Sequence, residues 1–417
     1  MSEWVFTLKL AFRSLGRNRR RSAITLAALT LSVAFVLIAF GFMAGLEEQS
    51  ANNLIRMDYG HLKIVPADFD PASPSFDTLM ALTDFPDSLI EVAGVEARAP
   101  RLKFPALLSD GLDQYPCLGY GLEKSLDAQV FDLVDFALQG RFWHEGERGM
   151  VVGSKVARTF RIAPDSIGGA ELTVLGRSTL GAIGAFDLPV LGIITTGYPL
   201  IDNGGVLLPL SLVQELLNAP GQVSEITLRL DNPDRLGSVQ RQLQTALAAA
   251  GLKAKVLSWR DLGQDFLALH RVKTTGMGIA MFFYVLIAII GVANAILISA
   301  FQRTREVGML RALGMSPREI MRQFLSEGGF LGLVGALIGG AMGTGFNLYL
   351  QEHGLNLTAL YGDIELGYPI KDYLYTHFSW DYLLVTIVGA VLLSALAAYF
   401  PARRTARLTP SEALRSM

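Results

Sequence analysis

The segment from residue 305 to residue 316, REVGMLRALGMS, combines the residue types that protein contact surfaces use. Its apolar side chains provide area for a partner to cover, and its arginines flank that area as charged groups that orient the partner. Its glycines lack a side chain, so a partner backbone can approach closely. We therefore expect a contact helix here. The residues expected to take part are Arg305, Glu306, Gly308, Met309, Leu310, Arg311, Leu313, Gly314, Met315 and Ser316.

Groups that catalyse reactions or hold metals are scattered along the sequence. The five histidines form no H-E-x-x-H pattern of the kind that binds zinc. Cys117 is the single cysteine, so a cluster of cysteine and histidine ligands is not expected either. A phosphate-binding loop of the form G-x-x-x-x-G-K-[ST] does not occur either. We expect the chain to be non-catalytic, with no metal site and no cofactor of its own.

Four apolar runs are long enough to cross a bilayer. They occupy residues 22–45, 276–300, 328–350 and 381–400, and about 20 residues are needed for a helix to span the hydrocarbon core. The first run follows a basic segment as a signal peptide would, but it is too long and lacks an A-x-A cleavage site. The sequence therefore predicts a membrane α-helical protein with four transmembrane helices.

The charge distribution predicts the orientation of these helices. The net charge is only −2, yet basic residues gather in residues 1–21, 301–324 and 401–417. Short basic segments stay on the cytoplasmic side, so both termini and the central connection are expected there, with residues 46–271 and 351–380 outside. Residues 1–21 have the spacing of an amphipathic helix at the membrane surface, or they form a plain cluster of orienting charges. Neither reading involves nucleic acid.

Residues 46–271 have the composition of a large extracytoplasmic α/β domain inserted between the first two spans. His61–Val65, Glu225–Leu230 and Lys253–Leu257 alternate as strands do, and residues 235–250 have the spacing of an amphipathic helix that Gly251 ends. We expect two subdomains, with strands from both ends of the segment meeting in space.

Three motifs resemble those of the FtsX/MacB-like ABC transporter permease superfamily. Residues 304–316 resemble its "REIGxLRAxGxS" signature, residues 401–415 are similar to its "PAxRAAxxxPxEALR" ending, and residues 146–157 look like its "GExxVVxGxxLA" segment. The resemblance implies a permease of the bacterial inner membrane. It also implies a coupling helix that docks on a cytoplasmic ATPase dimer, which binds ATP and Mg²⁺, and a second permease protomer, either identical or a related paralogue.

Residues 41–69 are similar to the opening of the outer domain in Lol-type permeases. This resemblance implies that a lipoprotein or a lipidic molecule is extracted from the outer leaflet. Moving acyl chains into water costs about 0.8 kcal/mol per CH₂, so an apolar cavity must shelter them. We expect such a cavity between two protomers, at the outer halves of the first two helices, although these residues could also simply face lipid. The expected lining is Phe35, Ile38, Phe42, Met43, Leu46, Phe282, Val285 and Ile289.

Two other functions remain open on the sequence. One is MacB-like efflux of drugs or peptides through a periplasmic adaptor, and the other is FtsX-like signalling to a periplasmic partner. In the lipoprotein reading, a periplasmic lipoprotein chaperone would receive the substrate. For lipoprotein or lipid extraction we expect mechanotransmission, in which ATP hydrolysis in the cytoplasm moves the outer domain.

Overall fold

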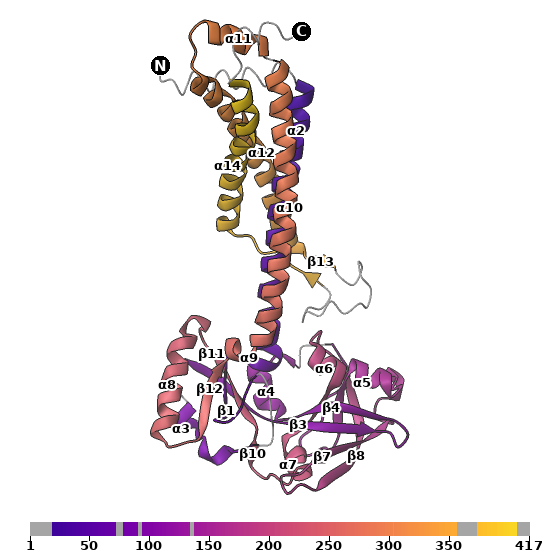
Figure 1. Cartoon of the computed structure of the whole chain (residues 1–417). Coiled ribbons are helices and arrows are strands. Elements are labelled where there is room, and N and C mark those ends of the chain that lie inside the picture. Colours follow the sequence, from indigo (N-terminus) through magenta and orange to yellow (C-terminus); the bar gives the residue numbers. More distant parts are fainter. Residues whose placement is uncertain are drawn as a thin grey trace. The chain divides into compact units, whose positions relative to one another are not determined.

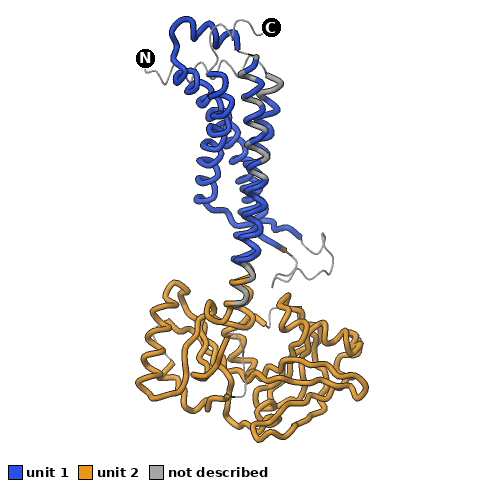
Figure 2. The backbone as a smooth tube through the Cα atoms, viewed as in Figure 1, with its two compact units in different colours: residues 1–48, 271–356, 374–417 blue, residues 49–270, 357–373 orange. Residues whose placement is uncertain are grey.

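The computed structural model describes residues 19–71, 78–90, 94–133, 137–302, 304–356 and 373–406, which form two compact units. The helical unit lies within residues 1–48, 271–356 and 374–417, and the sheet unit lies within residues 49–270 and 357–373 (Figure 2). The expected amphipathic helix before residue 19, most of the outer loop 351–380 and the tail beyond residue 406 lie outside the described residues.

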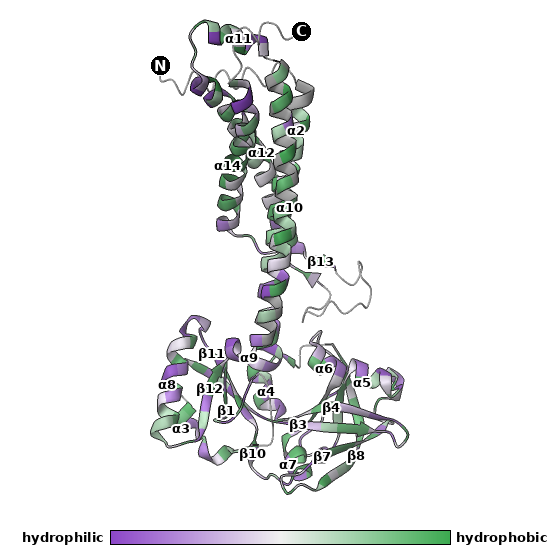
Figure 3. Cartoon of the chain, viewed as in Figure 1, coloured by the Kyte–Doolittle hydropathy of each residue, from purple (hydrophilic) through white to green (hydrophobic). Residues whose placement is uncertain are grey.

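Four long helices make up most of the helical unit (Figure 1): α2 (Arg19–Leu54), α10 (Gln264–Gln302), α12 (Pro317–His353) and α14 (Trp380–Ala406). Three of the described helices are long and apolar enough to cross a membrane, covering residues 23–59, 317–353 and 380–406. Hydrophobic residues also line much of α10 (Figure 3), whose run 276–300 carries no charge. That run remains the predicted fourth span.

Glycines allow α12 to pack closely against two neighbouring helices. A Cβ atom on Gly339 would lie 2.4 Å from the backbone oxygen of Thr30 in α2, and one on Gly332 would lie 2.7 Å from the Cβ of Ser394 in α14. Asn347 of α12 adds a polar link, because its Nδ2 donates a hydrogen bond to the oxygen of Leu37 at 2.9 Å. Gly332 and Gly339 of this helix therefore serve packing within the protomer, since small residues let membrane helices approach closely.

Ten strands form the main sheet of the other unit, in the order β12-β1-β11-β3-β4-β9-β6-β8-β5, with β7 pairing both β3 and β8. The long strand β3 pairs with β11 near its start and with β7 near its end, so the strands β3-β4-β9-β6-β8-β7 close into a ring. The bounds are β1 (Leu62–Pro66), β3 (Val95–Ser109), β4 (Gln114–Leu122), β5 (Ala137–Gly140), β6 (Met150–Gly153), β7 (Glu171–Arg177), β8 (Ile183–Thr195), β9 (Gly205–Pro209), β11 (Glu225–Leu230) and β12 (Ala254–Ser258).

The two faces of this sheet bury different side chains, because neighbouring residues of a strand point to opposite faces. On β3, Leu102, Phe104 and Leu108 belong to one apolar cluster, which α7 (Leu210–Leu216) and α8 (Leu236–Ala249) help to cover. Ala99 belongs to a second cluster together with Tyr120 of β4. Arg101 and Lys103 lie two and four residues after Ala99, so their side chains point to the same face of the sheet as Ala99. Charged groups are therefore directed at this second cluster.

The alternating segments near the ends of the sheet unit are strands, as predicted. β1 pairs with both β11 and β12 in antiparallel register, which confirms that strands from both ends of the segment meet. The amphipathic helix is α8, and Gly251 follows it with a φ of 70° that favours glycine.

Replacing Gly339 with alanine should destabilise the helical unit, because the new Cβ would collide with the backbone of α2. Overpacking of this kind costs about 1–3 kcal/mol. Gly345 is the matched control on the same helix, since a Cβ there meets nothing within 4 Å. Thermal unfolding of the purified protein in detergent should show a lower midpoint for G339A and no decrease for G345A. Equal midpoints would contradict the close packing of α2 and α12.

Candidate coupling surface, membrane cavity and buried ion network

A short helix and a tight turn carry the predicted contact segment. α11 (Thr304–Ala312) ends before Gly314, whose φ of 98° is a conformation that side chains disfavour. The amide of Met315 closes the turn by donating to the oxygen of Leu310 at 3.0 Å. Ser316 then caps the start of α12, where its side chain accepts from the amide of Glu319 and the Glu319 carboxylate accepts from the amide of Ser316. The turn is therefore held by bonds within the chain.

One side of α11 exposes apolar and basic side chains. Met309 is 49% exposed and Leu313, just beyond the helix, is 84% exposed. Arg305 is also exposed, and it lies four residues before Met309 on the same helical face. Leu310, Met315 and Glu306 are half-buried. The exposed stripe Arg305–Met309–Leu313 is thus the part of the predicted surface that a partner protein could cover.

Two predicted contact residues face inward instead. Gly308 is buried beside Val307 within the chain, and its contact with a partner stays a prediction. Arg311 donates from Nη1 to the oxygen of Ala406 at 2.7 Å, which links α11 to the end of α14. A cation at this position satisfies a terminal carbonyl and interacts favourably with the helix dipole. Both residues stabilise the protomer itself.

An apolar cavity of about 280 Å³ lies within the helical unit. Side chains from α2, α10 and α14 line it, among them Val36, Phe40, Met281, Phe282 and Leu393. Of the predicted cavity residues, Phe282 lines this space. Those on α2, namely Phe35, Ile38, Phe42, Met43 and Leu46, are exposed or half-buried outside it, and the side chains of Val285 and Ile289 lie outside the described residues. The predicted cavity between two protomers stays a prediction.

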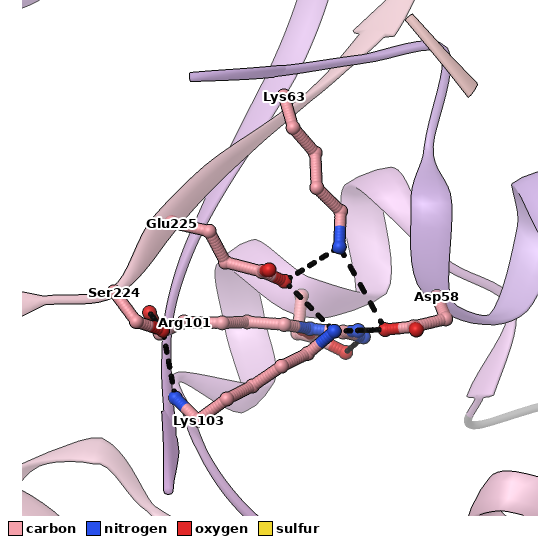
Figure 4. Close-up of polar contacts among 7 residues, drawn as sticks. Asp58, Lys63, Arg101, Lys103, Ser224 and Glu225 are labelled. Atoms are coloured by element: carbon pink, nitrogen blue, oxygen red, sulfur yellow. Dashed lines mark hydrogen bonds and ion pairs between the residues drawn. The ribbon is translucent and has the colours of Figure 1, made fainter. Parts of the chain in front are cut away.

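A network of six charged side chains is buried in the sheet unit (Figure 4). None of the six is more than 6% exposed, and three positive charges face three negative ones. The members come from five elements: Asp58 from the π-helical turn η1 (Ile55–Tyr59), Lys63 from β1, Arg101 and Lys103 from β3, Glu225 from β11 and Asp127 from α4 (Lys124–Val130).

Asp58 is the point where this network joins the first helix to the sheet. Its Oδ1 lies 2.5 Å from Lys103 Nζ, 3.4 Å from Arg101 Nη1 and 3.8 Å from Lys63 Nζ. Arg101 also pairs with Asp127 at 2.7 Å, and its guanidinium stacks 3.5 Å from the centre of the Phe131 ring. These contacts hold η1, the turn that follows α2 in the chain, against the sheet.

Glu225 lies 2.8 Å from Lys63 and 3.2 Å from Lys103. Burial alone would raise the pKa of Glu225, but Lys103 and Lys63 outweigh burial and hold this pKa below its ordinary value. Burial lowers the pKa of Lys63 to about 8, although Asp58 and Glu225 act in the opposite direction. For Lys103 the two carboxylates outweigh burial, so its pKa is raised. In their charged forms, three cations and three carboxylates of the network balance one another.

Known families match both units of the chain. The "MacB-like periplasmic core domain" matches residues 22–246, just over half of the chain, and the "FtsX-like permease C-terminal" region matches residues 278–410. The chain belongs to the FtsX/MacB-like permease family. It is an ABC transporter permease.

Relatives of this permease fall into two named groups. The lipoprotein-releasing system transmembrane protein LolC of Xylella fastidiosa is 25% identical, over 97% of this chain and 96% of its own. LolE of Haemophilus influenzae, from a system of the same name, is 25% identical over 93% and 92%. The macrolide export ATP-binding/permease protein MacB of Wolinella succinogenes is 24% identical over 98% of this chain, which spans 60% of the length of that MacB.

The sequence did not predict the ion network of this permease. A usable signal exists in hindsight, because Lys63 lies within the apolar strand β1, and Arg101 and Lys103 lie in the buried central part of β3. Charges inside a buried strand require partners of opposite sign. Those partners come from η1, α4 and β11, which no local pattern connects.

Removing one charge from the network should destabilise the permease strongly. Lys103→Met leaves Asp58 and Glu225 short of a partner, and breaking a buried pair costs about 3 to 5 kcal/mol. Arg56→Gln is the control, because it removes an exposed ion pair with Asp132 that is worth at most about 1 kcal/mol. Urea unfolding followed by tryptophan fluorescence, to which Trp143 in the adjacent cluster contributes, measures both changes.

The double variant K103M/E225M restores the balance of two positive and two negative charges. It should therefore lose less stability than the sum of the two single variants. Additive losses, or equal effects of K103M and R56Q, would contradict the assignment of one coupled network.

Proposed function

We propose that this permease couples ATP hydrolysis by a cytoplasmic ATPase dimer to the extraction or release of a lipoprotein, or another lipidic molecule, from the outer leaflet of the bacterial inner membrane. The observation that carries this proposal is the match to LolC, a protein named for lipoprotein release, over nearly the full length of both chains. Both termini and α11 lie in the cytoplasm in this proposal, and the sheet unit lies in the periplasm. A second permease protomer, identical or related, completes the transporter.

The stripe Arg305–Met309–Leu313 is the proposed docking surface for the ATPase. Two exposed apolar side chains next to an exposed arginine are typical of the centre of a protein interface. The turn after α11 is closed by its own hydrogen bonds, and Arg311 ties α11 to α14. A push on this surface would therefore move α12 and α14 together with α11.

The ion network is the proposed point at which such motion enters the sheet unit. A displacement of α2 acts on η1, and Asp58 in η1 is held by three cations of β1 and β3. Because every side chain of the network is buried, separating the charges would cost several kcal/mol, and the sheet follows the helix instead.

The cavity between α2, α10 and α14 has the chemistry to shelter part of an acyl chain. Its named walls are aliphatic, aromatic and thioether side chains. A macrolide is the competing substrate, because MacB relatives match 98% of this chain. The two substrates are separated by the second experiment below.

Leu313→Ser should weaken the association of the permease with its ATPase by about tenfold, since a well-covered apolar side chain contributes 1 kcal/mol or more to an interface, about 1.4 kcal/mol per tenfold change. The matched control is Leu180→Ser, which removes a leucine that is 80% exposed on the sheet unit. Co-purification and substrate-stimulated ATP hydrolysis should fall for L313S and stay unchanged for L180S. A normal complex with L313S would refute the docking surface.

Mass spectrometry of the permease–ATPase complex, purified in mild detergent without added substrate, tests the substrate class. We expect a bound triacylated protein or a defined lipid that is lost when ATP is added. A complex without lipidated cargo that retains a periplasmic adaptor would overturn lipoprotein release and favour efflux. Retention of a cell-wall hydrolase would favour signalling instead.

A further inference from the structure

An open groove of about 780 Å³ runs between α10 and α14, apart from the cavity described above. The two spaces share no lining residue. The groove has an apolar part and a basic end. Its principal lining residues are Ile290, Asn294, Leu297, Phe400, Arg403 and Arg404.

The apolar part of the groove needs an apolar occupant. Ile290 is 58% exposed and Phe400 is 76% exposed in the chain itself. Both belong to helices with long apolar runs, so their surroundings in the membrane are acyl chains. A groove between two such helices, rather than a flat surface, can hold one chain in a fixed position.

The basic end of the groove is formed by neighbouring arginines in the last turn of α14. Arg403 and Arg404 are both exposed, and neither forms an ion pair with a carboxylate among the described residues. Arg311, by contrast, is engaged by the oxygen of Ala406. Guanidinium groups bind phosphate through paired hydrogen bonds, so two of them favour an anionic phosphate group.

Asn294 supplies a polar group inside the groove. It lies one helical turn, about 6 Å along α10, beyond Ile290 in the direction of the basic end. Its side chain is exposed and makes no hydrogen bond with any described residue. An amide at this depth can donate to an ester carbonyl, the group that joins a lipid headgroup to its chains.

We propose that this groove is a binding site for an anionic phospholipid. The phosphate contacts Arg403 and Arg404, the ester region contacts Asn294, and an acyl chain continues from there along Ile290. Basic pockets between membrane helices favour such lipids over zwitterionic ones. The inference concerns a resident lipid and is independent of the transported substrate.

Native mass spectrometry of the full-length permease, titrated in detergent with phosphatidylglycerol or phosphatidylcholine, tests the site. The wild type should bind phosphatidylglycerol at least tenfold more tightly than phosphatidylcholine. The variant R403Q/R404Q should lose this preference. The control R318Q/R322Q removes the same charge from two exposed arginines of α12 outside the groove, and it should keep the preference.

A second variant leaves the charge unchanged. Ile290→Trp fills the apolar part of the groove and should weaken phosphatidylglycerol binding about tenfold, while soluble glycerophosphate should not displace the lipid. Equal losses in both arginine pairs would show general attraction to basic surfaces and overturn the proposal. Unchanged binding in R403Q/R404Q, or displacement by glycerophosphate, would overturn it as well.

Discussion

The sheet unit depends on a balance of buried charge. Three cations and three carboxylates from η1, β1, β3, α4 and β11 lie in one region with almost no access to water. Removing any one of them leaves an opposite charge uncompensated, so each element is held in place by the others. Asp58 belongs to η1, so the same balance holds this turn against the strands of the sheet.

The helical unit depends on a different constraint: glycines of α12 have no side chain and so allow neighbouring helices to approach closely. Gly335, Gly339 and Gly343 bring α12 against α2, whereas Gly332 brings it against α14. Lipid provides little hydrophobic drive for helices to associate, so close contact and the Asn347 hydrogen bond provide the stabilisation. Charge organises one unit and small residues organise the other.

Local patterns predicted much of this architecture. The spacing of apolar residues identified α2, α12 and α14 as membrane helices, and alternation identified β1, β11 and β12. Strand β3 escaped prediction because Pro100 and Pro105 interrupt its sequence, and the partners of Arg101 and Lys103 lie far away in the sequence. The same limit applied to the contact segment. Residue type predicted contacts of Gly308 and Arg311 with a partner, but it did not predict the burial of Gly308 or the hydrogen bond from Arg311 to Ala406.

The length of β3 has a mechanical consequence. Arg101 sits near its middle, and eight residues farther along, Ser109 ends the strand within the closed ring. At 3.4 Å per residue this is a lever arm of about 27 Å. A rotation of about 5° at the ion network would displace the far end by about 2 Å, comparable to the small shifts that move packed elements between alternative positions. A small rotation of β3 at the ion network would thus give a larger displacement at Ser109, without any rearrangement of the strand itself.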